Sequence, residues 1–270
     1  MSYAQAIILG LIQGFTEFLP VSSSGHLILV PRVFGWPDQG LAVDAALHLG
    51  TLAALVAYFR GELIGVAVGS VSRGLAALVV LATLPAGLAA LVFGAYIETA
   101  LRWPVLIAFT TAFWAIVMLV ADRRAGPPAP ATSTSSQLVI SDPLERIGWG
   151  QGLAVGLAQA LALIPGTSRS GITITTGLFA GLDRATAARY SFLLGIPITA
   201  AAGLKKAFDL SRDGLPAGET GPLAVAILVS FLSGWFAVWF LVSYLKRRSL
   251  TPFVVYRLAL AALIVAVWYR

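Results

Sequence analysis

Six apolar stretches, each about long enough to cross a bilayer, constrain this chain more than any other feature. A membrane-spanning helix needs about 20 predominantly apolar residues, with a range of about 17–25. The stretches cover residues 41–59, 75–97, 104–121, 187–204, 222–243 and 251–269. Only 11% of the 270 residues are charged, whereas a soluble domain carries about 25%. We therefore expect an all-α polytopic membrane protein.

Two further apolar stretches, residues 3–30 and 149–182, are interrupted by small and polar residues. The first contains PVSSSG at 20–25, and the second contains PGTSRSG at 165–171. Such turns leave backbone groups unpaired within the membrane, which is tolerated only where the backbone lines a protein-buried or water-filled cavity. We expect both stretches to be re-entrant helical hairpins, each returning to the side from which it entered.

The two hairpin stretches are similar in sequence. At an offset of 146 residues, Gln13 aligns with Gln159 and Ser22 aligns with Ser168. The same offset gives identities at Gln5/Gln151, Gly10/Gly156, Ser24/Ser170 and Gly25/Gly171. An ungapped match of this kind indicates an internal repeat rather than chance similarity between two apolar segments.

The repeated hairpin divides the chain into two halves. Residues 1–125 and 149–270 each hold one hairpin and three spans, and residues 126–148 form a low-complexity linker that we expect to be flexible. Because three is an odd number of spans, the second half must enter the membrane upside down. The sequence therefore predicts two inverted repeats, with a site at their interface near the membrane midplane.

Lys and Arg outnumber Asp and Glu by 18 to 12, but they form no basic stripe, so we expect no nucleic-acid partner. In a membrane protein such residues set the topology, because cytoplasmic loops carry an excess of them. One predicted side holds ten: Arg60, Arg73, Arg123, Arg124, Arg146, Arg184, Arg189, Lys246, Arg247 and Arg248. We assign that side to the cytoplasm, which places both termini outside.

The first hairpin carries candidate metal ligands. Gln13 and Glu17 are four residues apart and share a helix face. Both offer oxygen atoms, which Mg²⁺ accepts alongside phosphate oxygens and waters. The alternative is that Glu17 only braces the hairpin loop. A Cys/His zinc site is excluded because the chain has no Cys and only two His. One of them, His48, follows Asp44 by four residues. We expect this pair to serve packing or an intramembrane hydrogen bond, and the alternative is that it supports the residues of the site.

The second hairpin carries a candidate phosphate site. A Gly/Ser turn that opens into a helix presents backbone N–H groups to an anion, and Arg169 adds a fork suited to phosphate oxygens. The alternative is that Ser and Gly act here as ordinary helix caps. Arg169 occupies the position equivalent to Ser23, so in an inverted pair the two loops would face each other. We expect Arg169 to pair with a substrate phosphate, or with Glu17 when the site is empty.

At these residues the chain resembles a known family. EFLPVSSSGHLIL, at 17–29, and LIPGTSRSGITIT, at 163–175, resemble the two signature regions of the undecaprenyl-diphosphate phosphatase family, also called the bacitracin-resistance family. The resemblance covers nearly the whole chain, including DAALHLGTLAAL at 44–55 and FLLGIP at 192–197. It implies a multi-pass enzyme of the bacterial inner membrane, a homodimer, that depends on a divalent cation such as Mg²⁺ or Ca²⁺.

The resemblance also implies a reaction. Members remove one phosphate from undecaprenyl diphosphate, which regenerates the monophosphate lipid carrier for peptidoglycan synthesis and confers bacitracin resistance. The first family motif is Glu or Gln, three residues, then Glu. Gln13 and Glu17 match it in its Gln variant, which leaves the metal-ligand set open. The catalytic residues predicted in this way are Glu17, Ser23, His26 and Arg169. The predicted substrate-binding residues are Ser22, Ser24, Gly25, Gly166, Thr167, Ser168, Ser170 and Gly171.

Two questions stay open at the level of sequence. The nucleophile could be Ser23, with His26 as general base or acid, or His26 itself, or a metal-bound water. The second question is the class of protein, because inverted repeats with broken helices are also a transporter plan. A lipid-carrier flippase would need the phosphate-binding Arg169 but no nucleophile, so the reactive set favours the enzyme.

Overall fold

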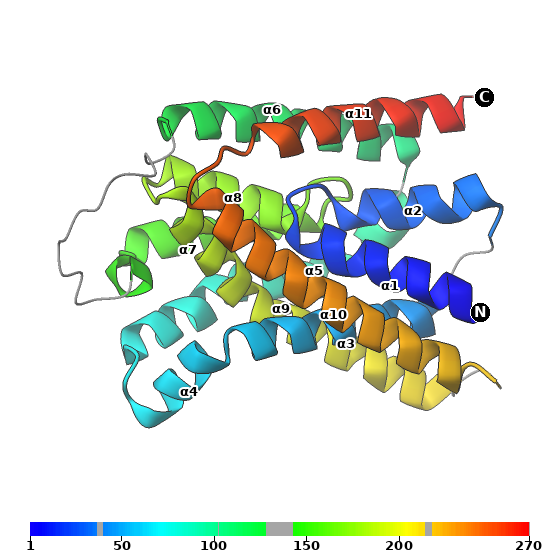
Figure 1. Cartoon of the computed structure of the whole chain (residues 1–270), viewed down its shortest axis with the longest axis horizontal. Coiled ribbons are helices and arrows are strands. Elements are labelled where there is room, and N and C mark those ends of the chain that lie inside the picture. The colour runs from blue at the N-terminus through cyan, green and yellow to red at the C-terminus, as the bar shows by residue number, and fades with distance from the viewer. Residues whose placement is uncertain (37–39, 102, 128–142, 214–217, 270) are drawn as a thin grey trace.

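The computed structural model describes residues 1–36, 40–101, 103–127, 143–213 and 218–269, and within these ranges the regular structure is entirely helical. The α-helices are α1 (Tyr3–Phe18), α2 (Ser23–Phe34), α3 (Gly40–Tyr58), α4 (Arg60–Val68), α5 (Arg73–Ala100), α6 (Pro104–Arg124), α7 (Trp149–Ala160), α8 (Arg169–Phe179), α9 (Arg184–Asp213), α10 (Thr220–Leu245) and α11 (Thr251–Trp268). Two short 3-10 helices, η1 (Pro143–Arg146) and η2 (Leu161–Leu163), complete the set (Figure 1).

All six predicted spans are helical. Five helices, α5, α6, α9, α10 and α11, are each long and apolar enough to cross a membrane, as judged on the described residues. The sixth candidate is α3, which continues into α4 after a bend of 62°. The sequence reading placed a loop at residues 60–74, whereas most of it is the helix α4. These helices make the chain a multi-pass membrane protein.

Each interrupted stretch forms a helical hairpin. α1 and α2 make the first, and α7 and α8 make the second, and the two enter the molecule from opposite ends so that their tips meet in the middle (Figure 1). The longest of these helices, α1, has 16 residues. At 1.5 Å per residue it reaches about 24 Å, short of the roughly 30 Å hydrocarbon core. No helix of either hairpin can therefore cross the membrane alone.

Small residues let the hairpins pack closely on their neighbours. A Cβ atom on Gly10 of α1 would lie only 2.9 Å from the Cβ of Val229 in α10, and Ser233 of α10 donates a hydrogen bond to the Gly10 carbonyl at 3.2 Å. On the other hairpin, a Cβ on Gly156 of α7 would collide with Ala82 of α5. Such contacts are typical of helix packing in lipid, and they hold both hairpins against long helices.

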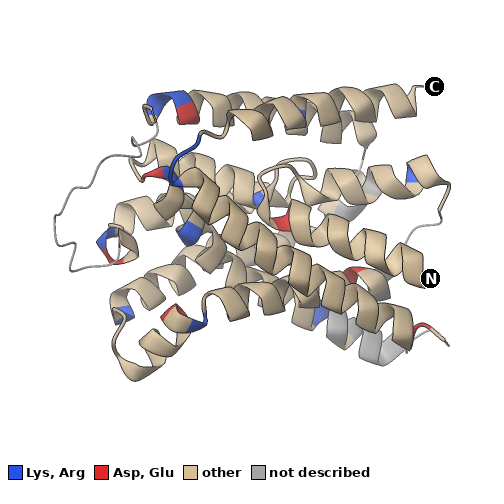
Figure 2. Ribbon diagram, in the orientation of Figure 1, with Lys and Arg blue, Asp and Glu red and all other residues tan. Residues whose placement is uncertain are grey.

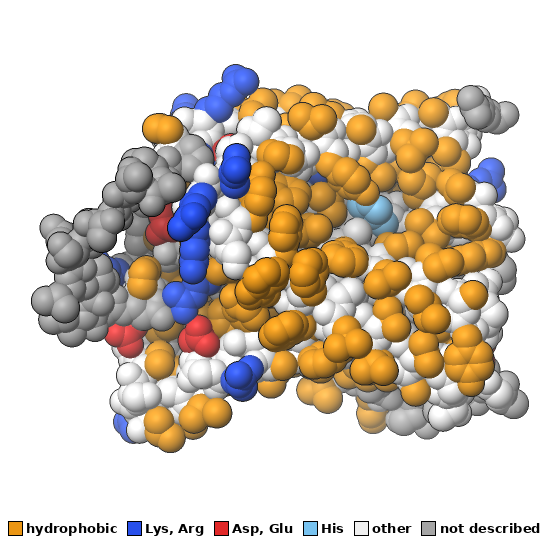
Figure 3. Space-filling model, in the orientation of Figure 1, with side chains coloured by type: hydrophobic (Ala, Val, Ile, Leu, Met, Phe, Trp, Pro, Cys, Tyr) orange, Lys and Arg blue, Asp and Glu red, His pale blue; other side chains and the backbone are white. Residues whose placement is uncertain are grey.

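The outer surface suits a lipid environment. Large apolar side chains such as Leu91, Val92 and Phe93 are more than half exposed, and hydrophobic side chains cover the middle of the face shown in Figure 3. Lys and Arg gather toward one end (Figures 2 and 3). That end also holds α4, the end of α6 and the α10–α11 loop, while both chain termini lie at the opposite end (Figure 1). The predicted basic loops thus share one side.

The basic end is tied together by buried ion pairs and by the end of the linker. Arg184 at the start of α9 pairs with Asp122 of α6 at 2.6 Å, and Asp122 also accepts the Leu250 N–H at 3.1 Å. Most of the linker, residues 128–142, lies outside the described residues. Its last part forms η1, where Leu144 is buried and Glu145 accepts the Ser72 N–H at 3.0 Å.

Candidate active site at the hairpin tips

The two hairpin tips share an unusual backbone conformation. Ser22 and Ser168 have φ of +76° and +70°, and they are the only non-glycine residues with positive φ among those described. This conformation costs a non-glycine residue on the order of 1–3 kcal/mol and persists only where the surroundings enforce it. Ser22 is the N-cap residue of α2 and Ser168 that of α8. Each strained serine therefore aims the start of a short helix, with its unpaired N–H groups, into the centre of the molecule.

The two tips are also hydrogen-bonded to each other, in each case between a serine hydroxyl of one tip and the backbone of the other. The Ser24 hydroxyl accepts the Gly166 N–H at 3.2 Å, and the Ser170 hydroxyl donates to the Leu19 carbonyl at 3.2 Å. Within each loop the alternate serines contact one another, Ser22 with Ser24 at 3.2 Å and Ser168 with Ser170 at 3.3 Å. The residues predicted to bind substrate are thereby brought together from both halves of the chain.

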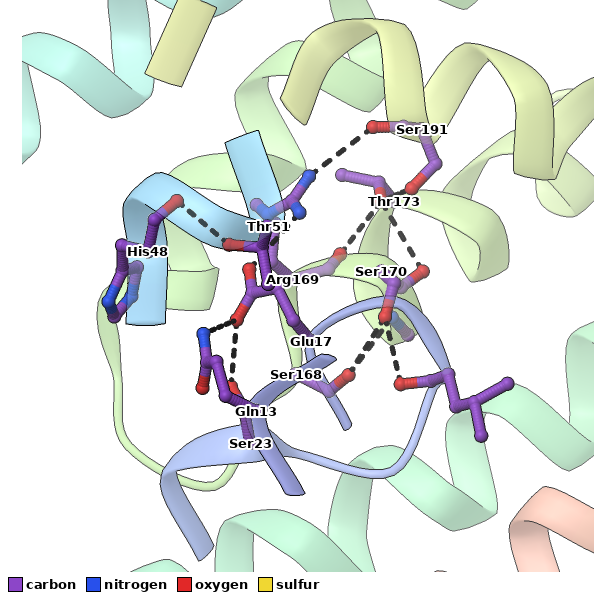
Figure 4. Close-up of polar contacts among 12 residues, drawn as sticks. Gln13, Glu17, Ser23, His48, Thr51, Ser168, Arg169, Ser170, Thr173 and Ser191 are labelled. Carbon is purple, nitrogen blue, oxygen red and sulfur yellow. Dashed lines mark hydrogen bonds and ion pairs between the residues drawn. The ribbon is translucent and has the colours of Figure 1, made fainter. Parts of the chain in front are cut away.

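Glu17 is the centre of the polar cluster between the tips (Figure 4). One carboxylate oxygen, Oε1, accepts from Arg169 Nη2 at 3.2 Å. The other, Oε2, accepts from the Ser23 hydroxyl at 3.0 Å and from Gln13 Nε2 at 3.2 Å. The Arg169 and Glu17 side chains are only 12% and 11% exposed. The predicted pairing of Arg169 with Glu17 across the two hairpins is confirmed by this geometry.

Three residues that the sequence reading missed set the position of Arg169. Thr173, one turn further along α8, donates to the Arg169 carbonyl at 2.7 Å and contacts the Ser191 hydroxyl of α9 at 2.6 Å. The Arg169 guanidinium reaches the Ser191 carbonyl in a long contact of 3.5 Å. A Cβ atom on Gly195 of α9 would collide with this guanidinium. The FLLGIP segment therefore contributes the space that Arg169 occupies.

His26 is turned away from this cluster. Its Nδ1 lies 2.7 Å from the Ser22 carbonyl, and because a carbonyl only accepts, Nδ1 must donate. In the neutral ring Nε2 is then an acceptor, and it receives the Tyr256 hydroxyl of α11 at 2.6 Å. The two rings are stacked with an interplanar angle of 9°. Both ring nitrogens are thus engaged outside the group of Glu17, Ser23 and Arg169.

His48 lies at the edge of the cluster, on the side where Gln13 is drawn (Figure 4). Its Nδ1 is 2.7 Å from the Asp44 carbonyl, so the expected intramembrane hydrogen bond exists but uses the backbone of Asp44. Thr51 donates to the His48 carbonyl at 3.0 Å. His48 is also close enough to Glu17 to interact electrostatically with its carboxylate. The histidine assigned to packing therefore borders the site.

The residues present can contribute to a cation site, but only in part. Across the described ranges, no group of three or more His, Cys, Asp or Glu side chains comes together as a metal site. Gln13 Oε1, however, is buried and has no hydrogen-bond partner there, and it lies next to Glu17. Mg²⁺ is usually held by one or two carboxylates with phosphate oxygens and waters. One amide oxygen and one carboxylate from this chain fit such a site when the rest comes from substrate and solvent.

A comparison with known proteins accounts for this arrangement. The model of the family described as bacitracin resistance protein BacA matches residues 6–263. The chain belongs to this family. The match includes both hairpin tips of this BacA-family chain and extends into α11.

Two relatives extend the comparison. A protein of Hahella chejuensis (strain KCTC 2396), named undecaprenyl-diphosphatase, is 42% identical over 272 residues and covers 97% of each chain. A protein of the same name from Idiomarina loihiensis (strain ATCC BAA-735 / DSM 15497 / L2-TR) is 42% identical over 280 residues, with full coverage of both chains. The resemblance to the bacitracin-resistance family is thereby confirmed for the whole chain.

Proposed function

We propose that this protein hydrolyses undecaprenyl diphosphate to undecaprenyl phosphate and inorganic phosphate. The reaction returns the lipid carrier to peptidoglycan synthesis and confers resistance to bacitracin. The observation that carries the proposal is the Glu17–Arg169 pair, with Ser23 on the same carboxylate, in a chain whose full-length relatives are named undecaprenyl-diphosphatase. Nothing in the described part of the chain favours the alternative of a lipid flippase.

Arg169 and the first turn of α8 bind the terminal phosphate. Among the described residues, the Arg169 guanidinium donates to Glu17 and makes a long contact with the Ser191 carbonyl, so a phosphate can replace the carboxylate as its partner. A guanidinium fork recognises phosphate oxygens in pairs, and the helix N-terminus adds backbone N–H groups. The negative charge that develops during transfer is stabilised by groups already in place, which is the most effective form of electrostatic catalysis.

Ser23 is the nucleophile that the geometry supports best. Its hydroxyl already donates to Glu17, so this carboxylate can take the proton as the Ser23 oxygen attacks the terminal phosphorus. The new bond joins that oxygen to phosphorus, the bond to the bridging oxygen breaks, and undecaprenyl phosphate leaves. A water molecule then releases inorganic phosphate and restores Ser23. His26, bonded to the Ser22 carbonyl, positions the strained turn rather than taking this proton.

A divalent cation, Mg²⁺ or Ca²⁺, completes the site in this proposal. Gln13 and Glu17 would hold it, and the unpaired Gln13 Oε1 supports that assignment. When bound, the cation supplies positive charge against the diphosphate.

The two halves of the chain are inverted repeats in this proposal, and the packing supports it. α1 lies against α10 as α7 lies against α5, and α2 lies against α11 as α8 lies against α6. α6 packs on α11 and α3 packs on α9, which are the contacts that a two-fold axis between the halves requires. Hairpins that enter from opposite faces then place the reacting groups near the midplane.

The protein works, in this proposal, as a homodimer in the bacterial inner membrane with its basic end in the cytoplasm. The chain has no native cysteine, so single cysteines report sidedness cleanly. In intact cells a cysteine at Ser249 should be shielded from an impermeant thiol reagent, and one at Gly218 should be labelled. The reverse labelling would invert the orientation.

Purified protein given undecaprenyl diphosphate tests the activity directly. We expect release of one phosphate per lipid, with undecaprenyl phosphate as the lipid product by mass spectrometry, and loss of release in excess chelator. Turnover that continues in chelator would remove the cation from the proposal. Translocation of the lipid without phosphate release would favour the flippase.

A further inference from the structure

Arg257 of α11 is the most deeply buried arginine in the described structure. It is 0% exposed and lies within an apolar helix long enough to cross the membrane. No acidic side chain pairs with it within the described ranges. A charge at this depth is costly, so intramembrane arginines are kept for a function. The role proposed above for Arg169 does not account for Arg257.

The guanidinium of Arg257 is bound almost entirely to backbone carbonyls. Nε donates to Thr111 of α6 at 3.1 Å, and Nη2 donates to Gly166 and Thr167 at 3.0 Å each. The hydroxyl of Thr110 donates to the Pro165 carbonyl at 2.6 Å. Three successive carbonyls of the PGTSRSG loop therefore point toward α6 and α11.

This anchoring fixes which way the loop N–H groups point. In a trans peptide unit the C=O and the N–H of the next residue are rigidly opposed. Holding the carbonyl of Thr167 against Arg257 thus turns the N–H group of Ser168 away from α6 and α11. The Thr167 N–H is used within the loop, where it donates to the Ile164 carbonyl at 3.2 Å. A released peptide unit could rotate and present its carbonyl oxygen to the anion, which it would repel.

We propose that Arg257 is a positioning residue that holds the carbonyl oxygens of this loop away from the substrate, so that the loop meets phosphate with N–H groups only. The inference rests on the proposed phosphatase function. Arginine suits the task because its planar fork binds two loop carbonyls and Thr111 at once, whereas the single ammonium of a lysine is strongly hydrated and lacks that fork. Arg257 acts through the loop and does not touch the phosphate.

Gly171 packs closely against the guanidinium of Arg257. A Cβ atom on Gly171 would lie 2.8 Å from Arg257 Nη1 and 3.1 Å from the Ser168 Cβ. Nη1 is buried and has no hydrogen-bond partner among the described residues, so only the missing side chain of Gly171 leaves it room. A methyl group there should push the guanidinium off the loop without removing its charge.

The test compares anion affinity with stability in purified protein. The probe is methylenediphosphonate, a non-hydrolysable diphosphate, titrated by calorimetry into wild type, Arg257→Lys, Gly171→Ala and the control Arg184→Lys. Arg184 is also a buried arginine, but it pairs with Asp122 at the basic end. We expect Arg257→Lys to raise the Kd at least tenfold. Gly171→Ala should raise it several-fold, and the Tm verifies that this variant remains folded.

The control separates positioning from folding. Arg184→Lys should lower Tm and leave the Kd of the folded protein unchanged. A wild-type Kd in both Arg257→Lys and Gly171→Ala would overturn the proposal, and if Arg257→Lys does not fold, Gly171→Ala decides alone. Absence of saturable binding by wild type would contradict the phosphate-binding loop and the proposal with it. Binding without turnover of undecaprenyl diphosphate would instead count against the proposed function and leave the role of Arg257 standing.

Discussion

The two hairpin tips have nearly the same backbone but carry different chemistry. Ser22 and Ser168 share the positive φ. Two aligned positions carry much of the difference. Glu17 of the first hairpin aligns with Leu163 of the second, and Ser23 aligns with Arg169. One hairpin therefore supplies the acid and the hydroxyl, the other supplies the guanidinium, and the polar cluster exists only where the two tips meet.

Gln13 and Gln159 occupy aligned positions in the two hairpins but differ in their hydrogen bonding. Both amides are buried. Gln13 donates to Glu17, while neither amide atom of Gln159 has a hydrogen-bond partner among the described residues. The aligned position beside Gln159 is Leu163, which cannot accept. The aligned glutamine therefore belongs to a polar network in the first hairpin, and it has none among the described residues of the second.

The largest effect should come from Glu17. Glu17→Gln removes the proton acceptor of Ser23 and the counter-charge of Arg169, and we expect kcat to fall about 10²–10⁴-fold, the usual contribution of a positioned base. The aligned control Leu163→Ala should retain activity near wild type. Phosphate release under saturating lipid diphosphate measures both. Equal losses in the two variants would end the distinction between the hairpins.

The second-largest effect should come from Arg169. Arg169→Lys keeps the charge but loses the planar fork, and a charged hydrogen bond contributes about 1.5–3 kcal/mol. We expect a folded, inserted protein with kcat/KM lower by about 10–100-fold, and a larger loss for Arg169→Ala. Gly195→Ala checks the same point from α9, because its new methyl group collides with the guanidinium. Wild-type kinetics in Arg169→Lys would refute paired recognition of phosphate by this residue.

The glutamine pair should separate activity from stability. Gln13→Met removes the unpaired amide oxygen beside Glu17, and we expect a loss of activity that higher Mg²⁺ partly restores. Gln159→Met removes a buried amide without partners, which should stabilise the fold by up to about 1–3 kcal/mol and leave activity unchanged. Kinetics across a Mg²⁺ titration and the Tm of each purified variant supply the comparison. An inactive Gln159→Met would give the second glutamine a function.

The smallest effect should come from Tyr256, which holds His26 of the first hairpin. Tyr256→Phe removes one hydrogen bond to the ring, worth about 0.5–1.5 kcal/mol, and leaves the stacking. We expect kcat/KM to fall less than about tenfold, because His26 positions the turn and does not carry the Ser23 proton. A loss as large as that of Glu17→Gln would show that His26 takes part in proton transfer.

The sequence was sufficient for the elements and for the central pair. The apolar lengths located five helices that can span a membrane and a sixth candidate in the bent α3–α4 pair, and the similarity of the two hairpins led to the pairing of Glu17 with Arg169. It also missed α4, since residues 60–68 fall between two predicted spans and are too few to form another span. α3 and α4 are separated by a bend at the end of α3 and not by a long non-helical segment.

Contacts between distant segments could not be predicted from the sequence. Tyr256 bonds His26 across 230 residues, and Arg257 supports a loop about 90 residues away. Neither pairing has a spacing signal, because residues that meet between packed helices share no local periodicity. His26 was predicted as a general base or acid from the chemistry of its side chain, whereas the hydrogen bond from Tyr256 of α11 that directs its ring leaves no local signal.

Phosphate release by wild type and by Ser23→Ala, measured side by side on undecaprenyl diphosphate, tests most directly whether the meeting of the hairpin tips is a phosphatase site. The Ser23 hydroxyl is small and partly buried, so the substitution should leave folding intact, and Tm verifies this. We expect wild type to convert the lipid diphosphate to the monophosphate and Ser23→Ala to release phosphate only at the background rate. A Ser23→Ala protein that turns over at the wild-type rate would contradict the serine nucleophile, and an inactive, folded wild type would contradict the phosphatase itself.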